Sequence, residues 1–338
     1  MPQGVTTQRA GSTRRLSRST LLIAVQLTVA FLALEIVGRV ANPLGISYYP
    51  ETARYFDTLV REGPIGYGNR PGLVGRFWGA AVRINSLGMR DREVGPAAAD
   101  GEFRLMVLGD SVPFGVGVSY EESIPYRLEE LLNASRPGGP RFRTLNMGVP
   151  SYNSEQQLIQ LQTLGLGLEP DAVLLLFAAN DIEPKNWVLE KRENRLVDLA
   201  QRSYAACLAV SAVRALRSAL RGPDAPPRFG PGHPRWAAVE GPLTEIGTIC
   251  RDRGIPFVVF TLFGAKWPEG LEQLERLGRS AGFPVFPLVP WEDPRFSAEG
   301  SAWFTNSATD SHPNARGSRI YASLIHEALE RAGVLPAR

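Results

Sequence analysis

The sequence predicts an α/β fold with a doubly wound parallel sheet for the part of the chain that follows residue 102. Short apolar runs of strand length alternate there with longer segments of helical periodicity. The run at 172–177 (AVLLLF) is apolar at every position, which is typical of a strand buried on both faces of a parallel sheet. Strands that alternate with helices in this way are joined by right-handed crossovers. We therefore expect one central parallel sheet with helices on both sides.

The N-terminal segment predicts a membrane anchor. The first 20 residues contain Arg9, Arg14, Arg15 and Arg18 and no acidic residue, and residues 21–37 are almost wholly apolar. We expect a cytoplasmic tail at 1–20 and a transmembrane signal-anchor helix at 21–40, which places the rest of the chain outside the cytoplasm. A cleaved signal peptide is the alternative, although Arg39 or Phe31 occupies a position where a cleavage site needs a small residue.

Residues 41–102 predict a small β-rich decoration. This stretch is rich in glycine, proline and aromatic residues, and a candidate strand at 75–83 lies between the turn sequences NRPG and NSLG.

The catalytic domain is expected at 103–335. Its strands are expected at 104–108, 144–147, 172–177, 256–262 and 284–288. Its helices are expected at 121–133, 154–164, 236–253, 271–280 and 315–331. The alternation pauses at about 184–234, where a helix at 202–220 precedes a Pro/Gly linker, and we interpret this as an insertion that roofs the pocket.

Composition excludes several classes of function. The net charge is only +3 and the densest basic cluster lies in the first eighteen residues, so a nucleic-acid partner is not expected. Cys207 and Cys250 are far apart and lack CxxC spacing, which argues against a zinc or dithiol site. We expect no metal and no organic cofactor, and a disulfide between the two cysteines stays open.

Residues suited to acyl transfer follow three of the predicted strands. Ser111 begins a helical segment after the first strand, Gly148 follows the second, and Asn180 follows the third. The carboxyl ends of parallel strands meet at one edge of a sheet, beside the point where the strand order reverses. Asp310 and His312 precede the last helix, whereas His326 lies inside that helix and His233 lies in the linker. His312 is therefore the one plausible base, and Asp310 is the candidate that orients it.

Each feature also has a purely structural interpretation. A serine after Gly-Asp is more often a helix N-cap than a nucleophile, and the segment at 310–314 is also what a capped helix start looks like. The succession of all the features along the chain favours a catalytic site.

The chain resembles the SGNH/GDSL-type hydrolases, including members anchored in a membrane. Four motifs carry the resemblance in the family's order: GDSVPFG at 109–115, NMGVPSYN at 146–153, FAANDI at 177–182 and DSHPN at 310–314. The stretch at 83–93 (RINSLGMRDRE) is similar to a lead-in of the membrane-anchored members. The family's pattern has glycine where this chain has Ala178, and often places its aspartate three residues before the histidine, whereas here the spacing is two. A backbone carbonyl is therefore the alternative to Asp310 as the partner of His312.

The resemblance implies a flavodoxin-like three-layer α/β/α fold and a serine esterase. By resemblance, Ser111 is the nucleophile, His312 the general base and Asp310 its partner, while the Ser111 and Gly148 amides and the Asn180 side chain form the oxyanion hole. The expected substrate is an acylated small molecule, glycan or lipid ester outside the cytoplasm. Two alternatives stay open, an O-acyltransferase that modifies an extracellular polysaccharide and a non-catalytic carbohydrate-binding protein.

Overall fold

A five-stranded parallel sheet forms the centre of the computed structural model, which describes residues 18–221, 233, 235–262, 268–290, 293, 295–296 and 303–336. The strands are β5 (Glu102–Gly109), β6 (Arg141–Asn146), β7 (Ala172–Phe177), β8 (Phe257–Thr261) and β9 (Val285–Pro287). Their order across the sheet is β6-β5-β7-β8-β9, and all four pairings are parallel. The order therefore reverses at β5, as in flavodoxin-like sheets.

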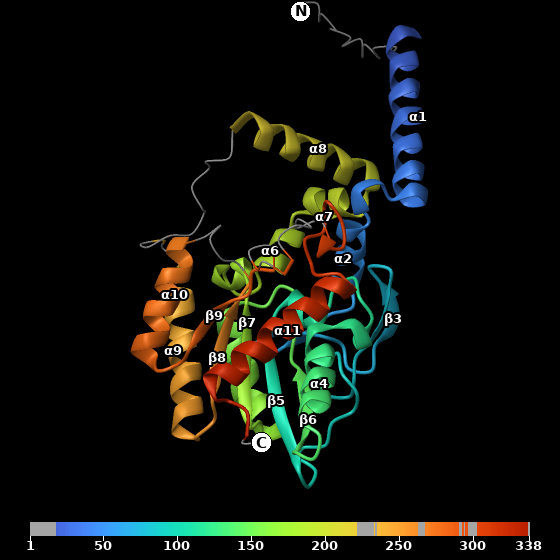
Figure 1. Ribbon diagram of the computed structural model, residues 1–338. Helices are drawn as coiled ribbons and strands as arrows, with labels where there is room; N and C mark the ends of the chain where they lie inside the picture. The colour runs from blue at the N-terminus through green and yellow to red at the C-terminus, as the bar shows by residue number, and fades with distance from the viewer. Residues whose placement is uncertain are drawn as a thin grey trace, which may run out of the picture.

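Helices cover both faces of the sheet (Figure 1). One face carries α4 (Ile124–Ser135) and α11 (Ala315–Ala332), and the other carries α5 (Ser154–Thr163), α9 (Ala237–Asp252) and α10 (Pro268–Ala281). Successive side chains of β5 alternate between these layers: Leu105 and Val107 pack with α4 and α11, and Met106 packs with α5. Burial on both faces explains why the strands are apolar at nearly every position, and the expected three-layer fold is confirmed.

The predicted strands agree with the observed ones to within three residues at each end. The helix expected from residue 121 begins instead at Ile124, because Tyr120–Glu122 form a separate 3-10 turn, η2. The strand expected at 75–83 is wrong. It is a hairpin of β3 (Val74–Phe77) and β4 (Ala80–Arg83), in which Trp78 and Gly79 turn the chain with φ of 50° and 77°.

The segment at 41–102 shares its core with the sheet domain. It contains a 3-10 turn, η1 (Pro43–Gly45), a helix that the sequence did not predict, α2 (Tyr48–Phe56), and a second small hairpin, β1 (Val60–Glu62) with β2 (Gly66–Gly68). The Tyr55 ring lies 5.1 Å from Phe77, 4.8 Å from Trp78 and 5.3 Å from Phe114, measured between ring centroids. Because Phe114 belongs to the sheet domain, the aromatic residues of this segment are buried against that domain.

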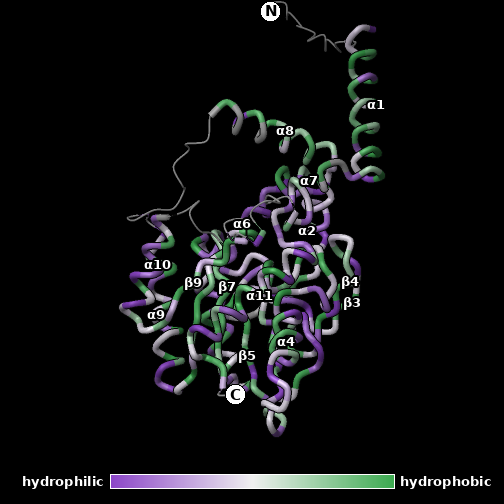
Figure 2. The backbone as a smooth tube through the Cα atoms, viewed as in Figure 1, coloured by the Kyte–Doolittle hydropathy of each residue, from purple (hydrophilic) through white to green (hydrophobic). Residues whose placement is uncertain are grey.

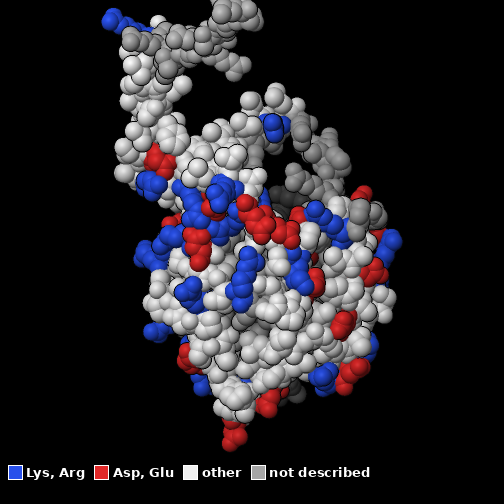
Figure 3. Space-filling model, turned by 180° about the vertical axis from the view of Figure 1, so that it is seen from behind, with Lys and Arg blue, Asp and Glu red and all other residues white. Residues whose placement is uncertain are grey.

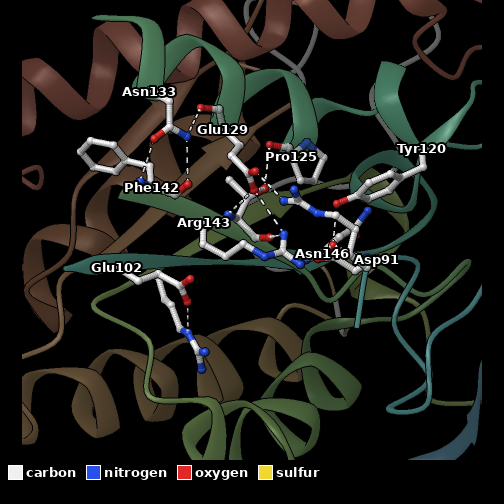
Figure 4. A network of polar contacts seen from close by, with 12 residues as sticks. Asp91, Glu102, Tyr120, Pro125, Glu129, Asn133, Phe142, Arg143 and Asn146 are labelled. Atoms are coloured by element: carbon white, nitrogen blue, oxygen red, sulfur yellow. Dashed lines mark hydrogen bonds and ion pairs between the residues drawn. The ribbon is translucent and has the colours of Figure 1, made fainter. Parts of the chain in front are cut away.

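Two consecutive charged residues before β5 tie this segment to the loops that follow β5 and β6. The Arg90 guanidinium is fully buried and donates to the carbonyl oxygens of Ala81, Phe114, Gly115 and Val118. Asp91 accepts from Arg143 Nη2 at 2.7 Å, from Tyr120 Oη at 2.5 Å and from the Asn146 backbone N–H at 2.9 Å (Figure 4). Burial of both charges is offset by these hydrogen bonds.

The N-terminal helix α1 (Arg18–Ala41) projects from the globular body (Figure 1). It is the one helix of the described chain that is long and apolar enough to cross a membrane, with a mean hydropathy of 2.3 over its most apolar window. Its apolar side chains are exposed, so it does not serve as a core helix, and Figure 2 shows mostly hydrophobic colour along it. Residues 1–17 of the expected tail lie outside the described residues.

The described part of the insertion contains three helices. They are α6 (Trp187–Glu193), α7 (Arg195–Arg202) and α8 (Tyr204–Arg221). Most of the predicted Pro/Gly linker, 222–232 and 234, lies outside the described residues. Cys207 on α8 and Cys250 on α9 are both buried, and they are not joined by a disulfide.

Removal of the Asp91 carboxylate is predicted to destabilise the chain strongly. Asp91→Ala leaves the buried Arg143 with only the longer ion pair to Glu129, at 3.2 Å, and leaves the Asn146 N–H without its acceptor, which together cost about 3 to 5 kcal/mol. Urea unfolding of the full chain in detergent, followed by circular dichroism, measures this loss. The exposed Asp100→Ala is the matched control, with a change within about 0.5 kcal/mol, and equal stability of the two variants would contradict the prediction.

Candidate active site

The loop after β5 carries the first site residue. Gly109 has a φ of 148°, and a Cβ on it would lie 2.7 Å from Pro113 Cγ and 3.0 Å from the Leu176 carbonyl oxygen, so glycine is required at this sharp exit. Asp110 caps the short helix α3 (Ser111–Phe114) through a hydrogen bond from Val112 N to Oδ1 at 3.0 Å. Ser111 is thereby held at the first position of α3, at the carboxyl edge of the sheet.

The segment before α11 brings His312 and Asp310 to this serine. His312 Nε2 lies 2.7 Å from Ser111 Oγ, and His312 Nδ1 lies 2.5 Å from Asp310 Oδ1. A proton on Nδ1 that donates to the carboxylate leaves Nε2 free to accept from the serine hydroxyl. The Asp310 side chain therefore reaches the imidazole although only one residue separates them in sequence.

Hydrogen bonds hold the Asp310 carboxylate in place. Its Oδ1 accepts from the His312 backbone N–H at 3.1 Å, and its Oδ2 accepts from Asn306 Nδ2 at 3.0 Å. Asn306 also donates to the Val116 carbonyl oxygen at 2.9 Å, which links this segment to the loop after α3. Asn306 is a supporting residue that no motif in the sequence pointed to.

The other two histidines lie elsewhere. His326 is on α11, with Nε2 3.2 Å from Ser135 Oγ, and His233 interacts with the backbone of Arg235. Of the three histidines, only His312 contacts Ser111.

A cavity of about 690 Å³ opens over the serine. Ser111, Asn180 and His312 line it together with Tyr48, Trp187 and Ser151. The ring centroid of Tyr48 lies 5.4 Å from that of His312, and burial raises the pKa of this tyrosine, with the Asp310 charge as the second cause. Trp187 comes from α6, in the insertion that the sequence analysis placed over the pocket. Tyr48 comes from α2, and nothing in the sequence pointed to the N-terminal segment as a wall of the cavity.

The two predicted oxyanion donors on the next strands have protein partners here. Asn180 Nδ2 donates to the Tyr152 carbonyl oxygen at 3.3 Å and lines the cavity. The Gly148 N–H donates to Asn146 Oδ1 at 3.0 Å. A Cβ on Gly148 would lie 2.3 Å from Phe114 N, so this glycine allows the loop after β6 to pack closely against α3. Their part in an oxyanion hole stays a prediction.

A buried carboxylate shapes the turn that carries Asn180. Asp181 in η4 (Ala179–Ile182) accepts from the Ala178 N–H at 2.5 Å and from the Gln157 side-chain amide. Burial raises the pKa of Asp181 well above its ordinary value, and the nearby charge of Asp110 raises it further. Burial also raises the pKa of Asp110. No cluster of three or more His, Cys, Asp or Glu side chains suited to a metal occurs among the described residues.

A known family matches the part of the chain that carries these residues. The model of the GDSL-like lipase/acylhydrolase family matches residues 107–320, more than half of the chain. The chain belongs to this GDSL-like family. It is therefore an ester-hydrolysing enzyme by family, and the Ser111 and His312 motifs both lie within the matched range. A comparison with curated proteins gave no match.

Solved structures that match this chain at low sequence identity include two esterases and an α/β hydrolase. The psychrotrophic esterase EstA from Pseudoalteromonas sp. is 14% identical with a TM-score of 0.44, and the match covers 68% of this chain and 97% of EstA. A two-domain esterase (CEX) active on acetylated mannans is 16% identical with a TM-score of 0.46, over 71% of this chain and 53% of CEX. LAE5, an α/β hydrolase from the Lake Arreo metagenome, is 15% identical with a TM-score of 0.42, over 70% and 97%.

Asp181→Asn is predicted to flatten the pH dependence of stability. The folded chain holds the Asp181 proton to a higher pH than the unfolded chain does, so stability falls as pH rises from the ordinary value of 3.8 through the raised pKa. A neutral amide has no proton to lose, and it can also donate to Gln157 Oε1, which has no partner among the described residues. Urea unfolding at intervals from pH 5 to pH 8 tests this. A variant whose stability falls with pH as steeply as that of the natural chain would contradict the raised pKa.

Proposed function

We propose that the chain is a carboxylic ester hydrolase in which Ser111 is the nucleophile, His312 the general base and Asp310 the residue that orients the imidazole. The observation that carries the proposal is the chain of two short contacts, 2.7 Å from Ser111 Oγ to His312 Nε2 and 2.5 Å from His312 Nδ1 to Asp310 Oδ1, at the floor of a cavity. Membership in the GDSL-like family supports the ester bond as the target.

The reaction proceeds through an acyl-enzyme. Ser111 Oγ attacks the ester carbonyl carbon while its proton passes to His312 Nε2, and the Asp310 carboxylate stabilises the resulting imidazolium. The tetrahedral intermediate collapses when the C–O bond to the alcohol breaks and His312 returns the proton to the leaving oxygen. Water then attacks the acyl-serine ester, His312 takes a proton from it, and the carboxylic acid leaves as the proton returns to Ser111 Oγ.

The negative charge on the carbonyl oxygen needs hydrogen-bond donors. We assign this role to the Ser111 and Gly148 N–H groups and to Asn180 Nδ2. Asn180 supports the assignment best, because it lines the cavity and its present bond to Tyr152 is long at 3.3 Å. Gly148 would have to exchange its bond to Asn146 for one to the substrate.

The proposed substrate is an ester of a glycan or a lipid outside the cytoplasm. We propose that α1 is a signal anchor whose basic end stays cytoplasmic, which follows from the arginines that precede it. The corresponding division of the chain is a tail at 1–20, an anchor at 21–40, a decoration at 41–102 and a hydrolase domain at 103–335 with its insertion at 184–234. A membrane-held enzyme with this orientation meets acylated cell-surface glycans and lipids.

Substitutions at the three key positions are predicted to separate their roles. Ser111→Ala and His312→Ala should each lower kcat/KM for p-nitrophenyl acetate by about 10⁴-fold or more, because both act in the bond-making step. Asn180→Ala should lower kcat by about 10²- to 10³-fold, the loss of one oxyanion donor.

His326→Ala is the matched control, since this histidine lies on α11 away from the cavity, and it should keep the natural rate. Circular dichroism shows whether each variant folds. Natural activity in a folded Ser111→Ala variant, or acyl transfer to an added glycan in preference to water, would contradict the proposal.

The anchor is tested by extraction of membranes with alkaline carbonate. The full chain should stay in the membrane pellet, because α1 buries apolar side chains in the bilayer that carbonate does not displace. Protease added to sealed inside-out vesicles should leave the catalytic domain intact. Release of the chain into the soluble fraction would mean that α1 is removed or does not insert.

A further inference from the structure

The helix α8 leaves the globular body and exposes apolar side chains to the surroundings. Val210, Val213, Leu216 and Leu220 are 46%, 48%, 60% and 78% exposed. Figure 1 shows α8 running crosswise to α1 beside its lower end, and Figure 2 shows hydrophobic colour along both helices. A surface helix of a water-soluble domain buries its apolar stripe against the core, whereas this one does not.

Contacts at the base of α1 fix the position of α8. Glu35 Oε2 on α1 accepts from Ser203 Oγ at 2.9 Å and from the Ala205 N–H at 3.0 Å, so it caps the first turn of α8. Gly38 packs so closely that a Cβ on it would lie 2.6 Å from Tyr204 Cβ. Arg39 stacks over the Tyr204 ring at 4.9 Å. The start of α8 is therefore held against the C-terminal end of α1. Both helices project from the same end of the globular body (Figure 1).

An apolar groove continues from these helices to the catalytic cavity. It is lined by Leu34 of α1, Leu208 and Ala212 of α8, Leu44, and Ala308. Ala308 also lines the catalytic cavity. The exposed apolar surface of α8 and the mouth of the cavity are thus neighbours.

The charges on α8 suit the surface of an anionic bilayer. The helix sequence contains three arginines, Arg214, Arg217 and Arg221, and no acidic residue. Figure 3 shows that most charged side chains of the face in view lie on the globular body, and that the column of α1 above its base is largely uncharged. An amphipathic helix with arginine as its sole charge type is typical of helices that lie in the interface of a membrane.

We infer that α8 is a second membrane contact, which lies in the interfacial layer of the bilayer that α1 crosses and brings the mouth of the catalytic cavity to the lipid surface. Lipid of the bilayer covers the exposed face of α8 and the groove. The inference rests on the proposed anchor but not on the proposed catalysis. It goes beyond an anchor, because a single spanning helix followed by a free domain would leave α8 in water.

Lipid cross-linking tests the contact without any substitution. The full chain is reconstituted in vesicles of phosphatidylcholine and phosphatidylglycerol (3:1) with a phospholipid that carries a diazirine on its acyl chain. After illumination, peptide mass mapping should find cross-links on α1 and on the segment at 208–220. Peptides that contain Val74, an exposed valine on β3, should carry none. Cross-links on α1 alone would overturn the inference while keeping the anchor, and their absence from both helices would remove the anchor as well.

Fluorescent labels at single cysteines measure the depth. Val213→Cys, Leu216→Cys and Val29→Cys carry the label in a background of Cys207→Ala and Cys250→Ala, with Val74→Cys as the matched control. Quenching by iodide should be at least about threefold weaker at 213 and 216 than at 74, because the lipid layer excludes the ion. Quenching by spin-labelled lipid should be strongest near the head groups at 213 and 216 and near the bilayer centre at 29.

Two results would overturn the inference. Labels at 213 and 216 that iodide quenches as strongly as at 74 would place α8 in water. Labels shielded from iodide but not quenched by spin-labelled lipid would mean that protein, such as a second copy of the chain, covers α8. Hydrolysis of p-nitrophenyl acetate by the same samples reports on the catalytic proposal separately.

Discussion

The parallel pairing of β5 with both β6 and β7 is the constraint on which the rest of the structure depends. Val107 pairs with Asn146 and Gly109 pairs with Leu176, so these strands end at the same edge of the sheet. The loops that follow them must therefore meet, whatever their sequences. Ser111, Gly148 and Asn180 become neighbours for this reason, and the segment before α11 needs only to pass over the same edge to supply His312.

The chain before β5 determines how rigidly this edge is held. Arg90 donates to carbonyl oxygens at the end of α3 and in the loop after it. Asp91 accepts from the Asn146 backbone N–H, and the Asn146 side chain accepts from the Gly148 N–H. Burial lowers the pKa of Arg90 to about 10, so the guanidinium is still charged at neutral pH. A buried charge is tolerated where every partner is in place, which makes the position of these loops sensitive to small changes in the segment. The N-terminal segment is therefore a structural part of the site, as Tyr48 in the cavity wall also indicates.

Much of this architecture is readable from sequence, because local signals coincide with it. The run at 172–177 is apolar throughout and becomes the central β7, and the GDS, NxG, ND and DxH sequences follow strands or precede a helix as expected. The spacing of Asp310 and His312 left their contact open in the sequence, but the geometry of the loop brings the two side chains to 2.5 Å. Ala178 in place of glycine is accommodated because its backbone is extended, with φ of −114° and ψ of 165°, a conformation that any residue adopts.

Other features depend on contacts between distant residues and have no local signal. The α2 helix lies among turn-forming residues and is stabilised by the packing of Tyr55 against Phe77, Trp78 and Phe114. The tight turn at Trp78 divides a stretch that has the composition of one strand. Three of the four carbonyl partners of Arg90 lie more than twenty residues further along the chain, and the contact of α8 with α1 joins Glu35 to Ser203, which are 168 residues apart.

Covalent capture of Ser111 tests whether its hydroxyl is an activated nucleophile. The full chain in detergent is treated with a fluorophosphonate, which reacts with serine hydroxyls whose proton is taken by a neighbouring base. One adduct per chain is expected, on the peptide that contains Ser111. The His312→Ala variant should keep its fold and form no adduct. A folded natural chain that forms no adduct, or forms it on another residue, would contradict the account.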